Sequence, residues 1–491
     1  MPFPFSVDRE APQPLYRQIA AQIRQQIREG RLPVGAKLPP IRQMAEQLGV
    51  TRLTAQTAYD ELRAQGWIET VIGKGTFVAR TARPEALIDS VGHSSTPDSV
   101  LDDQPKINQI AIVRSFAYAE PDPELFPAGE FWGELHRLRA ESAALLRYSW
   151  PQGDPALRTA LADLLRERGV EAMPDNILVT SGVTQGISLI TQALTRPGDV
   201  VVVERPTHLG LINSLRTYHV RAVDVPLDEH GPRLDELERI IVQYRPRFFH
   251  TVPNFHHPTG TLMSPERRRA LLALARRYSL ILVEDDSSGQ LAYDGDPAPA
   301  LKSLDEAEQV IYISSMSKVM MPGLRVGYVV APEPLHRQLV SLRRAADFCG
   351  PPFVQRAVAN FIQSGALRRH LRRVIPIYRE RRDRLLRDLR WHMPPGVTWT
   401  HPRGGFACWV TLPPGIDATV VSREVLRRGF AFTPGDAFLV APGSNDHLRI
   451  CFVSQPERVI SEAVVVLSRV IEAQTGEGDY WMPPHPDVPQ E

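Results

Sequence analysis

Apolar residues recur at the period of an α-helix near the start of the chain. Between 14 and 29 they return every four positions, which places them on one face of a helix. The face comprises Leu15, Ile19, Ile23 and Ile27. Gly30 follows directly and predicts the end of this helix.

Two shorter helices and a hairpin follow. One helix is expected to end at Gly49, and the next to cover 52–64 with Thr51 capping its N-terminus. The predicted inward residues are Ile41, Met44, Ala45 and Leu48 in the first and Ala55, Ala58, Tyr59 and Leu62 in the second. Two strand-like runs then flank a glycine-rich turn at 73–75, which predicts a hairpin. A helix-turn-helix followed by a basic hairpin indicates a winged helix.

The pattern changes from about residue 114 to 472, where short apolar runs alternate with helical stretches. The runs are NILVTSG, DVVVVERP, FFHTVPN, LILVEDD, VIYISSMSK and RVGYVVAP. Strands that alternate with helices predict parallel βαβ units and a doubly wound α/β sheet. Such sheets bind ligands at the carboxyl ends of their strands.

Composition separates the remaining segments. Residues 81–113 combine Ser, Pro and scattered acids with little periodicity, which is typical of a linker. The end of the chain is Pro-rich and is expected to be loose. The 491 residues therefore divide into a winged helix at 12–80, a flexible linker at 81–113, an α/β domain at 114–472 and a tail at 473–491.

Charge and composition exclude several classes of protein. The net charge is +1 and the hydrophobic content 43%, as in ordinary globular proteins. Residues 1–80 hold eleven Lys and Arg against seven Asp and Glu, a basic excess compatible with DNA binding. No apolar run is long enough to span a membrane, and the first residues do not resemble a secretion signal. Cys349, Cys408 and Cys451 lack metal-ligand spacing, so we expect a cytoplasmic protein without a metal site.

The third predicted helix is the candidate for reading DNA. Its N-terminal residues would face base edges in the major groove. These are Thr51, Arg52, Thr54 and Gln56. Arg42 and Lys74, the latter at the hairpin tip, are placed for phosphate or minor-groove contacts. A solvated helix face is the alternative for each polar residue.

Residues 14–78 resemble the GntR-type winged helix over nearly their whole length. The elements G-x-L-x-x-G-x-x-L-P, L-A-x-x-L-G-V-T/S-R and G-x-G-T-F-V are present, with Met44 in place of the usual Leu. The resemblance implies double-stranded DNA as a partner.

In the large domain, Lys318 directly follows an apolar strand. A lysine amine forms Schiff bases with aldehydes, and hydroxyls with an arginine suit a phosphate ester. Ser315, Ser317 and Arg325 lie close to Lys318 along the chain. A lone lysine after a strand is more often a surface residue, so the argument depends on these neighbours.

Two further motifs suit the same ligand. Asp285 ends the run LILVEDD, where a carboxylate could hold a protonated pyridine nitrogen, although Asp286 satisfies the same requirement. A cap or surface acid is the alternative. The run VTSGVTQGISL predicts a strand, a turn and a helix whose first N–H groups form an anion site. Its candidate phosphate-binding residues are Gly182, Val183 and Thr184.

Arg449 lies within the apolar run HLRICFV. An arginine in such a run suits a bidentate carboxylate clamp, and a buried structural ion pair is the alternative.

Together with LRYSWPQGDPALRTALADLLRERGV, VVVERPTHLG and VPNFHHPTG, these motifs resemble the fold-type I aminotransferase domain over 114–472, and the fusion resembles the MocR/GabR family. The resemblance implies pyridoxal 5'-phosphate (PLP) as cofactor. It implies that Lys318 forms the internal aldimine, that Asp285 pairs with the pyridine nitrogen, and that Arg449 binds the α-carboxylate of an amino acid. The implied phosphate ligands are Val183, Thr184, Ser315 and Arg325.

The same resemblance implies a homodimer, often head-to-tail. Tyr148 lies in a segment that in the family often reaches the neighbouring subunit's site, and His257-Pro258 falls where a cis bond is common.

Three positions depart from the family pattern. His208 replaces a common Tyr and could still stack on the ring, and His257 replaces an Asn. Ser287 and Ser288 occupy the place of a Tyr. The missing Asn and Tyr usually donate hydrogen bonds to the cofactor's phenolic oxygen, which His257 or a Ser could replace. We therefore hypothesise altered imine protonation and poor transamination.

We expect a PLP-dependent, DNA-binding transcriptional regulator whose large domain senses an amino acid, an amine or a B6 vitamer. The alternative is an active aminotransferase with an accessory DNA-binding domain. A regulator that senses the cofactor itself is a third hypothesis.

Overall fold

A computed structural model shows two compact units, Met1–Ser115 with Ser422–Ala431, and Phe116–Val421 with Phe432–Glu491. The structure describes residues 5–9, 11, 13–28, 31–33, 35–64, 67–71, 75–79, 113–441 and 443–475.

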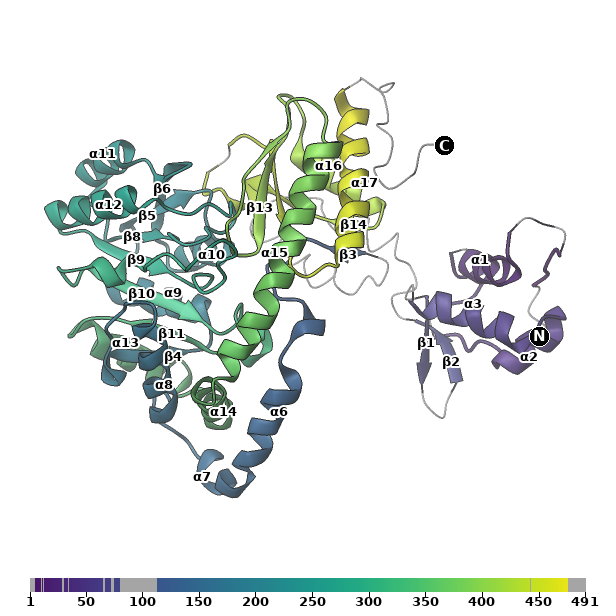
Figure 1. Ribbon diagram of the computed structural model, residues 1–491, viewed down its shortest axis with the longest axis horizontal. Coiled ribbons are helices and arrows are strands. Elements are labelled where there is room, and N and C mark those ends of the chain that lie inside the picture. The colour runs from purple at the N-terminus through teal and green to yellow at the C-terminus, as the bar shows by residue number, and fades with distance from the viewer. Residues whose placement is uncertain are drawn as a thin grey trace. The chain divides into compact units, whose positions relative to one another are not determined.

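The N-terminal part is a winged helix (Figure 1). Its elements are α1 (Leu15–Arg28), α2 (Ile41–Leu48), α3 (Arg52–Ala64), β1 (Ile68–Val71) and β2 (Gly75–Val78). The two strands pair antiparallel, and the three predicted helices and the hairpin are confirmed. Gly49 ends α2 with φ 62°, a left-handed conformation that glycine adopts without steric cost. The hairpin tip, with Lys74, lies outside the described residues.

The apolar faces predicted for the helices form one core. Ile19, Ile23 and Ile27 of α1 are buried against the inward residues of α2 and α3, while Leu15 is half-buried. Tyr59 closes this core from α3 by donating a hydrogen bond from its hydroxyl to the Pro39 carbonyl at 2.8 Å. The period of the apolar residues therefore predicted which side of each helix faces inward.

The large domain is built on an eight-stranded sheet in the order β4-β11-β10-β9-β8-β5-β6-β7. The strands are β4 (Ile177–Thr180), β5 (Val200–Arg205), β6 (Arg221–Asp228), β7 (Gly231–Pro232), β8 (Phe248–Thr251), β9 (Ile281–Asp285), β10 (Val310–Ser315) and β11 (Gly327–Val330). Strands β10, β9, β8, β5 and β6 run parallel, as predicted.

The sheet is mixed rather than wholly parallel. β11 runs antiparallel to both β10 and β4, and β7 antiparallel to β6. The connection from β10 to β11 covers residues 316–326 and contains no α-helix, so it cannot make the crossover that a parallel neighbour requires.

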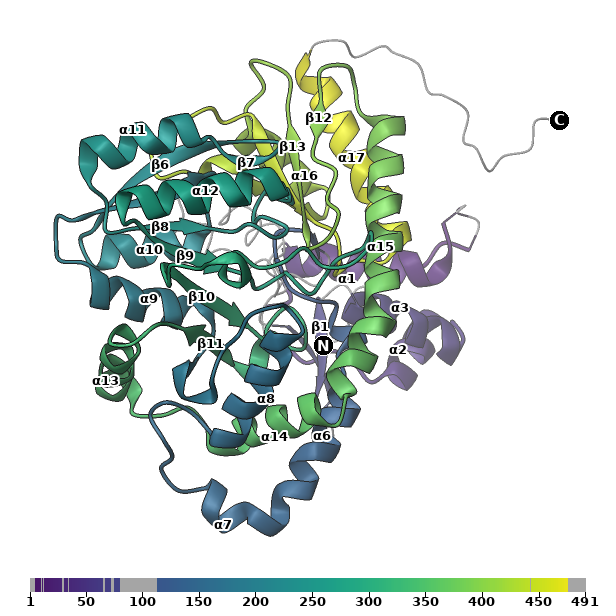
Figure 2. The same cartoon turned by 60° about the vertical axis from the view of Figure 1, so that its left-hand side comes forward.

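Helices cover both faces of this sheet (Figure 2). On one face, α9 (Val183–Leu194), α10 (Leu209–Thr217) and α13 (Leu335–Asp347) share a core with Val201 and Val203. On the other, α11 (Leu234–Tyr244) and α12 (Pro265–Tyr278) share a core with Val202 and Phe249. Successive residues of β5 thus point to opposite faces, which explains why its sequence is continuously apolar.

A smaller antiparallel sheet contains β12 (Thr398–Trp399), β13 (Ala407–Thr411), β16 (His447–Cys451) and β15 (Thr433–Pro434). Two long helices, α15 (Ala366–His392) and α17 (Glu457–Thr475), pack along each other (Figure 1). Helix α17 includes 473–475, which were expected in the tail, because its buried residues continue to Val470 and Ile471. The rest of the tail lies outside the described residues.

The remaining elements complete the two units. A short β3 (Arg114–Ser115) pairs in parallel with β14 (Phe430–Ala431). The other helices are α6 (Ala128–Arg137), α7 (Ser142–Leu145), α8 (Pro155–Arg166), α14 (Pro352–Gln363) and α16 (Ala418–Arg427), with 3-10 turns at Pro123–Leu125, Leu138–Glu141, Pro174–Asn176, Lys302–Leu304, Pro322–Leu324 and Gly435–Phe438. Within the described ranges, no helix is both long and apolar enough to cross a membrane.

Candidate functional site

The predicted chemical groups of the large domain meet at the carboxyl edge of the main sheet. Asp285 is the last residue of β9, and Lys318 lies three residues beyond β10. Gly182 lies between β4 and α9, and His257 follows β8. Side chains at the carboxyl ends of neighbouring parallel strands share one edge, so residues distant in sequence face a common space.

Lys318 is positioned by contacts from two other segments. Its Nζ donates a hydrogen bond to Ser288 Oγ at 3.3 Å and lies 5.9 Å from the centre of the Phe406 ring. Burial lowers the pKa of Lys318, and the nearby Asp285 carboxylate opposes this shift. A lowered pKa increases the fraction of neutral amine, the form that attacks an aldehyde.

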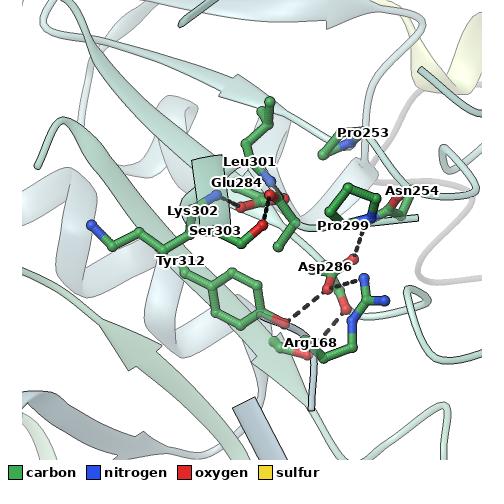
Figure 3. Close-up of polar contacts among 12 residues, drawn as sticks. Arg168, Pro253, Asn254, Glu284, Asp286, Pro299, Leu301, Lys302, Ser303 and Tyr312 are labelled. Atoms are coloured by element: carbon green, nitrogen blue, oxygen red, sulfur yellow. Dashed lines mark hydrogen bonds and ion pairs between the residues drawn. The ribbon is translucent and has the colours of Figure 1, made fainter. Parts of the chain in front are cut away.

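The adjacent acids Asp285 and Asp286 have different partners. Asp286 Oδ2 accepts hydrogen bonds from Arg168 Nη2 at 3.0 Å and Tyr312 Oη at 2.9 Å (Figure 3). Its Oδ1 accepts one from Asn254 Nδ2 at 2.7 Å. Asp286 is therefore fully used within the protein.

Asp285, in contrast, is bonded through only one of its carboxylate oxygens among the described residues. Its Oδ1 accepts hydrogen bonds from the amide and hydroxyl of Ser287 at 3.0 and 2.5 Å. No donor from the described residues reaches its Oδ2. The sequence left these two acids undecided, and the geometry favours Asp285 as the one that faces a ligand.

A buried network supports the end of β9 on the face opposite Asp285. Arg268 donates from Nη2 to Asn254 Oδ1 at 2.8 Å and from Nη1 to the Pro299 carbonyl at 2.7 Å. Glu284 accepts hydrogen bonds from the amides of Leu301 and Lys302 at 2.7 and 2.8 Å (Figure 3). Burial raises the pKa of Glu284 to about 8. Sequence reasoning missed this network, because its members are far apart along the chain.

The turn between β4 and α9 forms a narrow cradle with Arg325. Gly182 has φ 93°, and a Cβ on it would lie only 2.8 Å from Arg325 Nη2. A Cβ on Gly327 would lie 2.7 Å from the Gly182 carbonyl carbon. Arg325 donates to the Ser181 carbonyl at 2.7 Å. Both positions require glycine, and the guanidinium is held beside the first turn of α9, where Val183 and Thr184 begin the helix.

Two serines precede Lys318 at the edge of the sheet. Ser315 ends β10 and accepts a hydrogen bond from the Ser317 amide at 3.2 Å. These hydroxyls lie on the same connection as Lys318 and Arg325. N–H groups at a helix N-terminus, hydroxyls and a guanidinium are together the donor set of a phosphate ester site.

His208 and His257 lie close together within the protein. Their ring centres are 5.9 Å apart, at an angle of 66°. His208 Nδ1 is buried without a hydrogen-bond partner among the described residues, and burial lowers the pKa of His208 to about 4. Its ring lies beside Thr184, since a Cβ on Gly210 would contact both. The His257-Pro258 bond is cis, as expected.

Arg449 of β16 is buried, with no carboxylate partner in the described part of the chain. Its Nη1 lies 2.9 Å from His257 Nε2, and its Nη2 donates to Thr433 Oγ1 at 2.8 Å and to the Ala117 carbonyl. The guanidinium carbon is 4.8 Å from the centre of the Phe438 ring, and no described residue bonds to Nε. The buried ion pair considered from the sequence is therefore not observed.

The winged helix presents its own polar face. Thr51 Oγ1 accepts a hydrogen bond from the Thr54 amide at 3.1 Å, which caps α3. Arg42 and Arg52 are exposed, and Gln56 donates to Asp60 at 3.0 Å. Leu53 is 74% exposed on the same turn. It was not selected from the sequence, although the period already placed it off the apolar face.

Family comparisons agree with this architecture. Residues 118–467 match aminotransferase class I and II, and residues 15–78 match bacterial regulatory proteins of the gntR family. A probable rhizopine catabolism regulatory protein, MocR, from Rhizobium meliloti is 31% identical over 87% of this chain and 88% of its own length. The chain belongs to the MocR-type regulators.

Other relatives match about three quarters of this MocR-type chain. Aromatic-amino-acid aminotransferase 1 from Thermococcus litoralis is 35% identical over 75% of this chain and 90% of its own length. The solved structure of LysN from Thermus thermophilus, an α-aminoadipate aminotransferase complexed with N-(5'-phosphopyridoxyl)-L-leucine, superposes with TM-score 0.72 at 32% identity. It covers 79% of this chain and 97% of that one. The large domain therefore has the fold-type I aminotransferase fold, which typically carries PLP.

The residues of this MocR-type chain fit such a cofactor. The cradle at Gly182 excludes a side chain, the buried His208 Nδ1 is unpartnered, and Asp285 Oδ2 is free of donors from the described residues. The serines that replace the family's Tyr have other contacts, because Ser287 bonds Asp285 and Ser288 bonds Lys318.

Tyr148 lies on the surface of its subunit. It is 88% exposed and contacts the Phe348 ring edge-to-face, with the ring centres 5.3 Å apart. Leu146 and Trp150 beside it are also exposed.

Cys408 and Cys451 are buried and Cys349 is half-buried, all as free thiols. Across the described ranges, no cluster of His, Cys, Asp and Glu could hold a metal ion.

Proposed function

We propose that this MocR-type regulator is PLP-dependent and senses an amino acid, an amine or a B6 vitamer in its large domain. The observation that carries the proposal is the convergence of Lys318, Asp285 and the Gly182–Arg325 cradle beside a buried Arg449 that has no acidic partner among the described residues. A site for catalysis and a site for sensing can share this chemistry. The fused gntR-type domain favours sensing.

Each residue has a proposed role. Lys318 attaches the cofactor aldehyde covalently, Asp285 pairs with the pyridine nitrogen, and His208 stacks on the ring. Arg449 binds the effector carboxylate, and His257 and Ser288 lie at the phenolic oxygen. The proposed phosphate ligands are Gly182, Val183, Thr184, Ser315, Ser317 and Arg325. When bound, PLP supplies an electron sink.

The proposed DNA contacts follow from the winged-helix geometry. The residues at the start of α3 read bases in the major groove, and basic side chains contact phosphates. These residues are Thr51, Arg52, Thr54 and Gln56 for bases, and Arg42 and Lys74 for the backbone. The chain is proposed to act as a homodimer in which the exposed surface around Tyr148 meets the partner.

The proposed organisation of the chain follows the division at 12–80, 81–113, 114–472 and 473–491. A linker between the DNA-binding and sensing domains lets the two heads of a dimer bind two half-sites.

An active aminotransferase is the second candidate function. The Thermococcus litoralis relative and a 2-aminoadipate transaminase from Thermus thermophilus, 34% identical over 75% of this chain, are named as enzymes. Against rapid turnover stands the loss of the usual donors to the phenolic oxygen, since Ser287 is directed to Asp285 instead. Sustained multiple turnover with amino acid and keto acid panels would support the enzyme.

The decisive experiment replaces the attachment residue. Lys318→Ala should abolish the bound chromophore of the purified full chain while basal DNA binding, measured by footprinting on its own upstream region, is retained. Arg337→Gln, a change on the exposed surface of α13, is the matched control. Retained cofactor absorbance in Lys318→Ala would refute the assignment. An unchanged footprint with and without PLP would refute PLP-dependent regulation.

A further inference from the structure

Arg449 of the candidate site also binds the chain segment at the start of the large domain. Its Nη2 has two hydrogens, and both are used, one for the Ala117 carbonyl and one for Thr433 Oγ1. Nη1 contacts His257, and Nε has no partner in the part of the chain that the structure describes. Both hydrogens of Nη2 are thus used in hydrogen bonds, whereas the hydrogen of Nε is not.

A bidentate carboxylate needs two adjacent N–H groups. A guanidinium offers two such edges, Nε with Nη2 and Nη1 with Nη2, and both include Nη2. Because Nη2 has no free hydrogen, a carboxylate that chelates Arg449 must displace either the Ala117 carbonyl or the Thr433 hydroxyl.

The two acceptors differ in how they can respond. Thr433 Oγ1 rotates about χ1 and can turn its own hydrogen toward an incoming carboxylate. The Ala117 carbonyl is fixed in the backbone and can only accept. Thr433 Oγ1 lies 3.4 Å from that carbonyl, so it currently donates there. A carboxylate that takes the Nη2 hydrogen from the Ala117 carbonyl and the hydrogen of Thr433 Oγ1 would remove both of these hydrogen bonds to Ala117.

Ala117 lies where the linker joins the large domain. It is four residues beyond 113, the last residue of the predicted linker. Phe116 accepts a hydrogen bond from the Cys451 amide at 2.9 Å and packs on Phe432, with the ring centres 5.3 Å apart. Ala117 follows β3 by two residues along the chain, and Thr433 follows β14 by two residues.

We propose that Arg449 and Thr433 form a latch on the Ala117 carbonyl, and that an effector carboxylate opens it. The effector thereby loosens the segment at 113–117, to which the linker is covalently joined. This inference rests on the proposed function, because it requires a carboxylate at Arg449. It adds the contact through which effector binding at Arg449 would affect the linker and the winged helix.

The test is amide hydrogen exchange on the PLP-loaded full chain. The probes are sodium maleate, which has carboxylates but no amine, and the common L-amino acids, each compared with sodium chloride at equal ionic strength. We expect faster exchange at 113–120 with a bound probe. Thr433→Val should show the faster exchange without any probe, and its DNA affinity should move toward that of the probe-bound wild type.

Matched variants control for simple destabilisation. Thr433→Ser keeps the hydroxyl and should restore wild-type exchange. Thr191→Val makes the same chemical change at a buried threonine of α9 whose hydroxyl bonds the Ile187 carbonyl, and it should leave 113–120 unchanged. If Thr433→Val fails to fold, the response of wild type and Thr433→Ser to the probes still decides the question.

The outcomes separate the latch from the function. If no probe changes the cofactor spectrum or binds by calorimetry, the carboxylate site itself fails and the latch with it. If a probe binds but exchange at 113–120 stays the same, the latch is overturned and the carboxylate site stands. Equal exchange in Thr433→Val and wild type would also overturn the latch.

Discussion

The start of α3 and the carboxyl edge of the main sheet both present polar side chains, but they use them in opposite ways. On α3, Arg52 is exposed to solvent, and Gln56 bonds a neighbour on its own helix. At the sheet edge, Asp286 and Arg449 are buried and bonded to distant segments. The first surface is open to solvent, whereas the polar groups of the second are held by contacts within the protein.

That difference sets the cost of a substitution. An exposed side chain leaves nothing unsatisfied when it is removed, so the loss is limited to its ligand contact. A buried polar residue leaves its partners without hydrogen bonds in a medium of low dielectric constant. We therefore expect large effects on stability at the sheet edge and modest effects on affinity at α3.

The sharpest case is the pair of adjacent acids. Asp286→Asn should lower the free energy of unfolding by about 3–5 kcal/mol, because it leaves Arg168 buried without a counter-charge. Asp285→Asn should leave stability nearly unchanged and weaken PLP binding. Denaturant unfolding of the apo-protein and PLP titration measure the two effects. Equal stability of the two variants would remove the distinction between these acids.

The buried histidines predict a dependence on pH. Burial lowers the pKa of His208 to about 4 and also lowers those of His250 and His257. As pH falls below about 6.5, the unfolded state binds protons first, so stability declines between pH 6.5 and 4. For His208 alone the loss is about 3 kcal/mol at most. His208→Phe should flatten this decline, and an unchanged slope would contradict the burial argument.

At the DNA-reading surface the expected loss is smaller. Arg52→Ala should weaken specific binding by about 1–3 kcal/mol and relax preference at one base position. Arg42→Ala should weaken binding uniformly across sequences and reduce the salt slope by about one. Fluorescence anisotropy over a salt series, with operator variants, separates these roles. A uniform loss for Arg52→Ala would reassign it to the backbone.

The smallest effect concerns the cap of α3. Thr51→Ala removes the acceptor for the Thr54 amide and should cost about 1 kcal/mol of winged-helix stability. Thr57→Ala is the control, since its hydroxyl bonds the Leu53 carbonyl within the helix. Thermal unfolding, monitored by hydrogen exchange of the amides in α3, measures the stability of both variants. The cap assignment fails if the two variants lose the same stability.

The sequence predicted the two regions to different depths. The bounds of α2 and α3 were predictable because Gly49 and Thr51 separate them and each has an unbroken apolar face. Lys318 and Asp285 were found because one lies just beyond a strand and the other ends one. Which of Asp285 and Asp286 is bonded within the protein could not be predicted from the sequence. It depends on Arg168, which lies 118 positions away from Asp286.

Other features lay beyond sequence reasoning for related reasons. The antiparallel β11 has an apolar sequence like those of the parallel strands of the sheet. Its direction therefore depends on the short connection before it. The acceptor of Arg449 at Ala117 is a backbone carbonyl, which no residue type reveals. The pattern of apolar residues predicts which side of a helix or strand is buried. The hydrogen-bond partners of a polar residue depend on which distant segments the fold brings beside it.

The run of three acids at Glu284, Asp285 and Asp286 has a consequence for how β9 finds its place. Successive side chains of a strand point to opposite faces, so a slip of one residue would still direct an acid toward Lys318. The need for an acid beside Lys318 could therefore not distinguish the right alignment from the wrong one. Arg168 and Arg268 can, because only the correct alignment supplies the buried network that contains Glu284 and Asp286. The two arginines thus favour the correct alignment of β9 over one that is shifted by a residue.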